Sequence, residues 1–276
     1  MAAAFALLAS LTWGVGDFLG GLKSRSLSAL AVMAVSQPFG LAVLAVATAV
    51  RGTAPPGPEI AWAALAALLG TLGLVAFYRG MATGAMSVVA PIAAVAAGIP
   101  VIWGLSRGDT VSFVQELGFL AALGGGLLTS LDRGGERPRL AAGTGWALLA
   151  VLGFGGYYIP LHAAAQHDWL WPSLVFRMTS VTLVWSALLV TRGSVRGARI
   201  HLPALVAVGL LDTGGNALFA AASSSHGLLS VVSVLASLYP AVTVVLARLA
   251  LGERVARSQD AGVLLTLVGV AMISAG

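Results

Sequence analysis

About ten apolar runs, each roughly twenty residues long, determine what this chain can fold into. A helix needs ~20 mainly apolar residues to cross the hydrocarbon core of a bilayer, and Gly, Pro and charged residues mark the ends of these runs. We expect membrane helices near residues 2–22, 28–50, 60–80, 85–106, 112–131, 141–163, 173–191, 203–222, 227–249 and 258–275. The sequence therefore predicts an all-α integral membrane protein with about ten transmembrane helices and only short connections.

The composition excludes a soluble domain. Of 276 residues, 58% are hydrophobic and 9% are charged, whereas a soluble domain is ~25% charged. The net charge of +5 does not indicate a nucleic-acid partner, because the Lys and Arg residues lie in the short connections and form no stripe on one helix. The chain has no cysteine, and we expect neither a metal nor a cofactor. The first apolar run lacks a basic segment before it, so we interpret it as the first span and not as a signal peptide.

The two halves of the chain resemble each other. GDTVSFVQELGFL at 108–120 matches GERVARSQDAGVL at 252–264, and GAMSVVA at 84–90 matches GLLSVVS at 227–233. Further matches are Thr71 with Thr213, Gly73 with Gly215, Phe77 with Phe219, and ALLA at 6–9 with ALLA at 147–150. Because each half has an odd number of crossings, the second enters the membrane from the opposite side, as in many secondary transporters. We predict one membrane domain made of two inverted-topology five-helix repeats, residues 1–139 and 140–276.

Two segments resemble a known family. The first run carries TrpGly at 13–14, and the small-residue run at 227–250 ends in Tyr239-Pro240 and LeuGlyGluArg at 251–254. Together with the order of the runs, these segments resemble the ten-helix drug/metabolite transporter (DMT) superfamily of the EamA type. The resemblance implies a central substrate cavity and alternating access; relatives export amino acids, other metabolites or drugs, and some import. The first half departs from the pattern with SerArgGlyAsp at 106–109, and the resemblance assigns no binding residues.

Acidic side chains within the apolar runs are the first candidates for a functional site, since charges in a membrane are costly. Asp212 lies ~14 Å into its span, with Asn216 one turn further on the same face. Asp17 lies ~8 Å from the same membrane face, so the two carboxylates could share one cavity. Burial disfavours the charged form of a carboxylate, so one of these acids could carry a proton as the coupling ion. The greater depth of Asp212 favours Asp212 for this role. Alternatively, each is satisfied locally, for example Asp17 by Lys23 or Arg25.

Four other residues are candidates for the cavity lining, each with a structural alternative. Arg177 could bind a carboxylate or phosphate, or could extend to the lipid headgroups. Gln37 precedes a mid-span proline and could be a hinge element or a ligand donor. Trp13 and Tyr239 are mid-span aromatics that either line the cavity or pack against other helices.

No enzyme motif is present: the sequence contains neither HExxH, GxSxG nor GxxxxGK[ST]. We therefore predict a secondary active transporter that moves a small metabolite or drug-like solute across the cytoplasmic membrane by alternating access. Two acids against one arginine favour a zwitterionic or cationic solute, and the family resemblance implies export of an amino-acid-like compound. The predicted partners are this solute, the lipid bilayer and protons; a monomer would suffice, and a dimer is possible. A channel or scaffold, and a membrane-embedded lipid-modifying enzyme, are the alternatives.

Charge asymmetry gives a prediction of orientation. We call the side on which the chain begins side A, and the side reached by the first span side B. Of fifteen Lys and Arg residues, twelve lie on side B, which the positive-inside rule places in the cytoplasm, with both termini outside. These twelve are Lys23, Arg25, Arg79, Arg133, Arg137, Arg139, Arg192, Arg196, Arg199, Arg248, Arg254 and Arg257. The family resemblance implies the reverse orientation, and we follow the charges.

Overall fold

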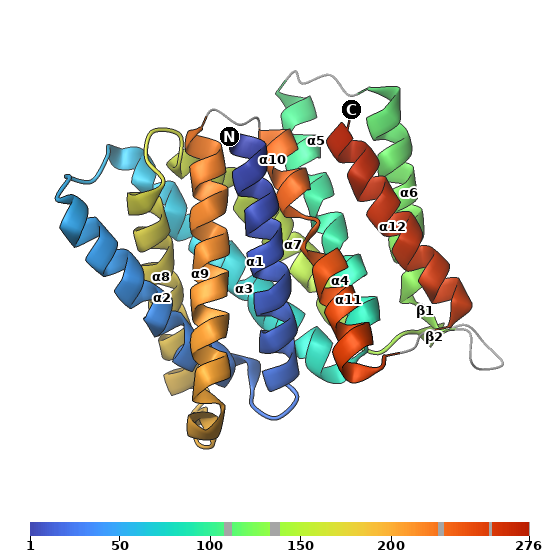
Figure 1. Cartoon of the computed structure of the whole chain (residues 1–276), viewed down its shortest axis with the longest axis horizontal. Helices are drawn as coiled ribbons and strands as arrows, with labels where there is room; N and C mark the ends of the chain where they lie inside the picture. The colour runs from blue at the N-terminus through green and yellow to red at the C-terminus, as the bar shows by residue number, and fades with distance from the viewer. Residues whose placement is uncertain (108–111, 133–138, 226–228, 254–255, 276) are drawn as a thin grey trace.

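Membrane-length helices make up almost all of the structure, a computed structural model that describes residues 1–107, 112–132, 139–225, 229–253 and 256–275 (Figure 1). The helices of the first half are α1 (Ala2–Lys23), α2 (Ala29–Arg51), α3 (Ala61–Thr83), α4 (Met86–Ala94) with α5 (Gly98–Ser106), and α6 (Phe113–Ser130). Those of the second half are α7 (Thr144–Ala164), α8 (Leu170–Val190), α9 (Leu202–Ser224), α10 (Leu229–Ala236) with α11 (Tyr239–Leu251), and α12 (Arg257–Ala275). Short elements join them: η1 (Pro58–Ile60), η2 (Val95–Ala97), η3 (Ala198–His201), and the antiparallel pair β1 (Leu131–Asp132) and β2 (Arg139–Leu140).

The predicted all-α membrane fold is confirmed. Each of the ten predicted runs is helical, and among the described residues eight helical segments are long and apolar enough to cross a membrane. Several residues on which the sequence interpretation drew lie outside the described residues: positions 108–111, Arg133, Arg137, 226–228 and Arg254.

The fourth and ninth spans are interrupted, whereas the sequence pattern predicts at each place one helix that is kinked at a proline, Pro100 or Pro240. Proline has no N–H to donate to the carbonyl four residues earlier. Pro240 therefore leaves the carbonyl of Ala236 without its helical partner, and α10 ends at Ala236. Pro100 does the same to Ala96, which lies in the 3-10 turn η2 between α4 and α5. The two interruptions therefore have the same cause in both halves.

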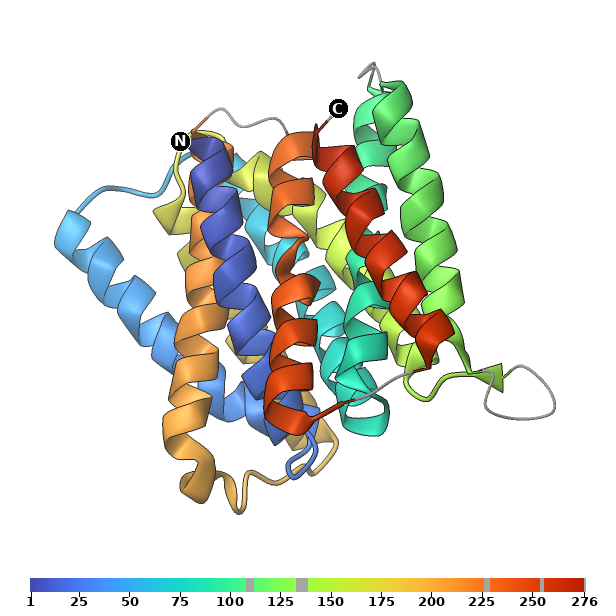
Figure 2. The same cartoon turned by 45° about the vertical axis from the view of Figure 1, so that its right-hand side comes forward.

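Helices from the two halves pack on each other in matching pairs. α1 packs along α9, α3 packs along α7, α2 packs along α8, and α6 packs along α12 at one edge of the molecule (Figures 1 and 2). Glycines allow the close approaches: a Cβ at Gly209 of α9 would lie 1.8 Å from the carbonyl oxygen of Ser36 in α2. Such small-residue contacts are the usual way in which membrane helices come together.

Both ends of the chain lie on side A. In Figure 1, α1 begins and α12 ends at the same edge, while the α1–α2, α8–α9 and α11–α12 connections lie at the opposite edge, side B. This arrangement agrees with the predicted number of crossings. The orientation relative to the cytoplasm stays a prediction.

An ion pair connects three segments on side B. Arg25, in the α1–α2 connection, contacts Glu253 with Nη2–Oε1 at 2.6 Å. The same carboxylate accepts hydrogen bonds from the N–H groups of Met86 (3.3 Å) and Ser87 (3.0 Å) at the start of α4. Burial raises the pKa of Glu253, but these hydrogen bonds outweigh the effect and hold the pKa below its ordinary value. We refer to Arg25, Glu253 and the start of α4 as the side-B latch.

A second ion pair lies on side A, between α2 and the α7–α8 connection. Arg51 donates from Nη1 and Nη2 to both oxygens of Asp168, at 2.7 and 2.6 Å. Asp168 also accepts from the N–H groups of Leu170 and Trp171 at the start of α8. Burial raises the pKa of Asp168, but the hydrogen bonds and the charge of Arg51 have a larger opposite effect. The pKa therefore lies below its ordinary value, and the carboxylate is charged at neutral pH.

Candidate functional site

A cavity lies in the middle of the helix bundle, between the two halves. The cavity volume is about 40 Å³, and the total empty space within the lining, including gaps between side chains and the part open to solvent, is about 480 Å³. All seven site residues predicted from the sequence line it: Trp13, Asp17, Gln37, Arg177, Asp212, Asn216 and Tyr239. The other lining residues are Gly70, Thr71, Leu74, Phe154, Tyr157, Tyr158, Phe176 and Ser180. The cavity therefore collects side chains from α1, α2, α3, α7, α8, α9 and α11.

Arg177 and Asp212 form an ion pair inside this cavity. Nη2 of Arg177 lies 2.7 Å from Oδ2 of Asp212, and the two side chains are 1% and 13% exposed. The alternative that Arg177 extends to the lipid headgroups is therefore wrong, because its guanidinium is buried against α9. Its Nε and Nη1 are also buried and have no hydrogen-bond partner among the described residues. The guanidinium thus retains donors for a further acceptor.

Asp17 lies beside this pair but is not part of it. Asp17 is 6% exposed. Among the described residues its carboxylate has neither an ion pair nor a hydrogen bond. The alternative that Arg25 satisfies it is wrong, because Arg25 contacts Glu253. α1 crosses α9 at the neighbouring Gly16, where a Cβ would lie 3.6 Å from the backbone nitrogen of Asp212. Two acids from different helices therefore face one cavity.

The two amide side chains of the cavity are anchored by near neighbours. Asn216 donates through Nδ2 to the carbonyl oxygen of Asp212 at 2.8 Å and, more weakly, to Oδ1 of the same residue at 3.4 Å. Gln37 accepts a hydrogen bond from the Ser180 hydroxyl at 3.2 Å, which connects α2 to α8. Each amide keeps hydrogen-bonding capacity, since an amide has two donors and an acceptor.

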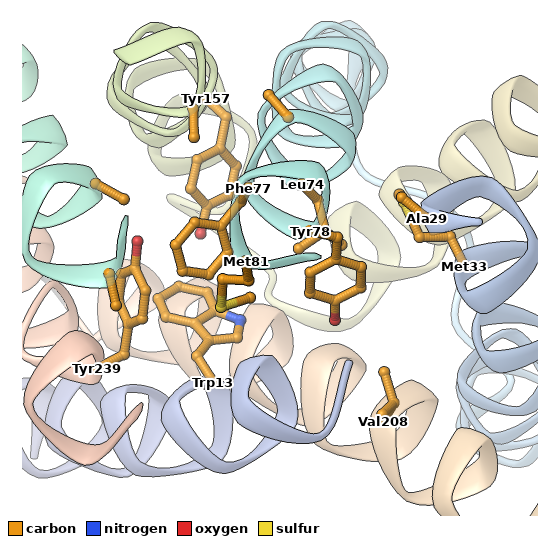
Figure 3. Packing of buried hydrophobic residues seen from close by; sticks show 14 of the residues in the cluster. Trp13, Ala29, Met33, Leu74, Phe77, Tyr78, Met81, Tyr157, Val208 and Tyr239 are labelled. Carbon is orange, nitrogen blue, oxygen red and sulfur yellow. The ribbon is translucent and has the colours of Figure 1, made fainter. Parts of the chain in front are cut away.

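Aromatic rings form one wall of the cavity. The ring of Trp13 lies 6.1–6.3 Å, centroid to centroid, from those of Tyr157, Tyr158, Phe219 and Tyr239. Figure 3 shows the indole of Trp13 between α1 and the side chains of Phe77, Tyr157 and Tyr239. Trp13 and Tyr239 therefore both line the cavity and pack, so the two alternatives weighed for them are compatible. The hydroxyl of Tyr239 is buried without a hydrogen-bond partner among the described residues.

Sequence reasoning missed the residues of α3 and α7 in this lining. Tyr157 and Tyr158 follow PheGly at 154–155, which is the counterpart of TrpGly at 13–14 in the repeat. The alignment of the two halves that pairs Trp13 with Phe154 also pairs Asp17 with Tyr158. The repeat could therefore have predicted that Tyr158 lines the cavity. Thr71, the counterpart of Thr213, was visible in the same way.

Acidic groups outnumber basic groups in the cavity lining. Two carboxylates face one guanidinium, so the charged groups sum to one negative charge when both acids are ionised. Aromatic faces attract cations further. Among the described residues no group of three or more His, Asp or Glu could hold a metal ion.

Comparisons with known proteins agree with this geometry. Residues 141–275 match the EamA-like transporter family. The second half of the chain therefore belongs to this family. Together with the apolar helices, this match makes the chain a multi-pass membrane transporter of the drug/metabolite transporter type, as the resemblance implied. A solved structure described only as "Crystal structure of protein" has a TM-score of 0.71 and 17% sequence identity, covering 98% of this chain and 95% of that chain. This likeness shows a common fold over nearly the whole chain. No curated protein matches the sequence.

Proposed function

We propose that this EamA-like protein is a secondary active transporter that exports a cationic or zwitterionic small solute across the cytoplasmic (inner) membrane. The observation that carries the proposal is the composition of the cavity: Asp17 and Asp212 face a single guanidinium, Arg177, within an aromatic wall. A cationic group would compensate the excess negative charge, whereas an uncompensated anion would meet like charge. In a zwitterion, the carboxylate would use the free donors of Arg177.

Alternating access fits the arrangement of the helices. The proposed repeats, residues 1–139 and 140–276, both contribute to the cavity and contact each other through matching pairs, α1 with α9 and α3 with α7. Interrupted spans such as α4–α5 and α10–α11 are common beside substrate sites in transporters built from inverted repeats. One chain supplies the whole lining, so a monomer would suffice for transport. A proton is the proposed coupling ion, because the cavity contains two acids, of which Asp17 is buried and the Asp212 side chain is 13% exposed.

Three probes that share one ring but differ in charge would test the substrate class. Phenethylamine is a cation, phenylalanine a zwitterion and phenylacetate an anion at neutral pH. In proteoliposomes we expect saturable counterflow with phenethylamine or phenylalanine and none with phenylacetate. A matched variant, Trp62→Ala, changes an exposed aromatic residue of α3 outside the cavity and should leave counterflow unchanged. Saturable counterflow of phenylacetate alone would contradict the proposed substrate class, and ion conductance without counterflow would indicate a channel.

A further inference from the structure

Two acids of one cavity differ in how their charge is compensated. Asp212 is paired with Arg177 at 2.7 Å, and the guanidinium is 1% exposed. Removing Asp212 from this pair would leave the almost fully buried guanidinium of Arg177 as an uncompensated charge. Asp17 has no such counter-charge among the described residues, although it is 6% exposed. An isolated charge in such a place is costly, and a proton or a cation would remove the cost.

Among the described residues, no Lys or Arg side chain forms an ion pair with Asp17. α1 packs against α2, α3, α9, α10 and α11. The titratable or charged groups that face Asp17 from these helices and from their neighbours α7 and α8 are Asp212, Arg177 and the hydroxyls of Tyr78, Tyr157, Tyr158 and Tyr239. The only cation of the group, Arg177, is held by Asp212. The described side chains of α2 and α10 add no titratable group near Asp17.

We infer that Asp17 is the exchange carboxylate of the transporter, at which a proton and the cationic group of the solute compete, and that Asp212 is a positioning residue for Arg177. The inference rests on the proposed function and refines it, since the depth argument had favoured Asp212 as the proton carrier. When the solute binds, the proton of the Asp17 carboxyl group leaves to the solution that the cavity faces, and the solute cation takes its place. When a proton returns, the solute is released. One proton therefore crosses the membrane in the opposite direction for each cationic group that is transported.

The pH dependence of phenethylamine counterflow tests this competition. In the wild type we expect the KM for phenethylamine to rise roughly tenfold for each pH unit below the midpoint of the exchange carboxyl group. In Asp17→Asn the KM should be at least about tenfold higher at alkaline pH and should not change with pH. Asp17→Glu should restore the pH dependence, because a carboxylate is again present. Asp212→Asn should keep the pH dependence, whatever its maximal rate.

Two results would overturn the assignment while leaving transport intact. One is an Asp17→Asn variant whose KM follows pH as in the wild type. The other is a pH dependence that disappears in Asp212→Asn and persists in Asp17→Asn, which would return the exchange role to Asp212.

A ligand-free measurement separates this inference from the proposed function. If the wild type shows no counterflow with any of the three probes, the proposed substrate class has failed, and infrared spectroscopy of the reconstituted protein still decides on Asp17. We expect a carbonyl band of a protonated carboxyl group that disappears with rising pH, is absent from Asp17→Asn and is retained in Asp212→Asn. A band absent from Asp212→Asn and retained in Asp17→Asn would overturn the inference.

Discussion

The side-B latch is the contact whose removal should change the conformational equilibrium most directly. Glu253 lies in the α11–α12 connection of the second half, while Arg25 and the start of α4 belong to the first half. The carboxylate therefore connects the halves at the membrane surface. Glu253→Gln keeps the size of the side chain and an acceptor oxygen but removes its charge. We expect this variant to open side B more often.

The magnitude follows from the contacts. Hydrogen bonds to a charged group contribute ~1.5–3 kcal/mol against ~0.5–1.5 for neutral ones, so neutralising Glu253 weakens the Ser87 bond by about 1 kcal/mol. The loss of a negative charge at the N-terminus of α4 adds ~0.3–1 kcal/mol. The pair with Arg25, whose side chain is 36% exposed, adds at most about 0.5 kcal/mol after screening. The total, about 2 kcal/mol, corresponds to roughly a 30-fold shift toward the open state.

Because the chain has no cysteine, one introduced thiol reports the opening without background. Met81, near the side-B end of α3, is 0% exposed and packs on α1 at Gly21, where a Cβ would lie 2.6 Å from its Cε; Figure 3 labels it. A membrane-impermeant maleimide should label Met81→Cys about 30-fold faster when Glu253→Gln is added. The matched control is Glu59→Gln, the same change in the α2–α3 connection on side A. An unchanged rate, or an equal increase with Glu59→Gln, would refute the latch.

The latch should also respond to pH with a definite sign. The pKa of Glu253 is lowered in the closed protein, so its stabilising effect is present above the ordinary pKa of a glutamate. The effect is lost as the pH falls through the lowered pKa. The labelling rates of the Met81→Cys protein with and without Glu253→Gln should therefore differ at neutral pH and converge in strong acid.

Three further predictions concern the ion pair, the packing and the orientation. Arg177→Ala should lower the free energy of unfolding by ~3–5 kcal/mol because it leaves Asp212, whose side chain is 13% exposed, without its counter-charge; Asp212→Asn in the same protein should restore part of the loss, measured by thermal unfolding in detergent, and no restoration would contradict the pair. Gly209→Ala should cost ~1–3 kcal/mol, because its Cβ would lie 1.8 Å from the Ser36 carbonyl oxygen, whereas Gly214→Ala in the same helix meets nothing within 4 Å and serves as the control; equal melting temperatures would refute the argument. A phosphatase that is active only outside the cytoplasm should be active when fused after Gly276, and fluorescence of a cytoplasm-only fluorescent protein fused there would reverse the orientation.

Hydropathy alone predicted the spans because burying apolar residues in lipid requires long runs, and such runs are visible in sequence. The interruptions at Ala236 and η2 were not predicted as breaks, although Pro240 and Pro100 were in view. Membrane helices often continue through a proline, since neighbouring helices can satisfy the freed carbonyl. Pro38 illustrates this, because α2 continues through it from Ala29 to Arg51. Which prolines interrupt a helix depends on neighbours that the sequence does not reveal.

The charged residues of the cavity could be predicted from the sequence, but the ion pair between Arg177 and Asp212 could not. Asp17, Asp212 and Arg177 stand out because ionisable residues are rare in apolar runs. Arg177 contacts Asp212 because of how α8 and α9 are rotated about their own axes. Counting residues from the end of a span gives the depth of a residue in the membrane but not this rotation. Tyr157 and Tyr158 were missed for a different reason: an aromatic residue in an apolar run has no signature of its own, since the same residue suits lipid, packing or a cavity wall.

The two acids of the cavity have no acidic counterparts in the other half of the repeat. The register that pairs Thr71 with Thr213 pairs Gly70 with Asp212, and Asp17 is paired with Tyr158. Both acids therefore lie on α1 and α9, which pack on each other, while their uncharged counterparts lie on α7 and α3, which pack on each other as well.

A solute in the cavity thus touches a charged helix pair on one wall and an uncharged pair on the other. If the two pairs move relative to each other during transport, access to the cavity changes while Asp17 and Asp212 keep their distance across the α1–α9 contact at Gly16. The two acids then move as one unit, and their separation is the same in both states. Competition between proton and solute would therefore be governed by the same carboxyl group on either side of the membrane, which is the condition for a coupled exchange.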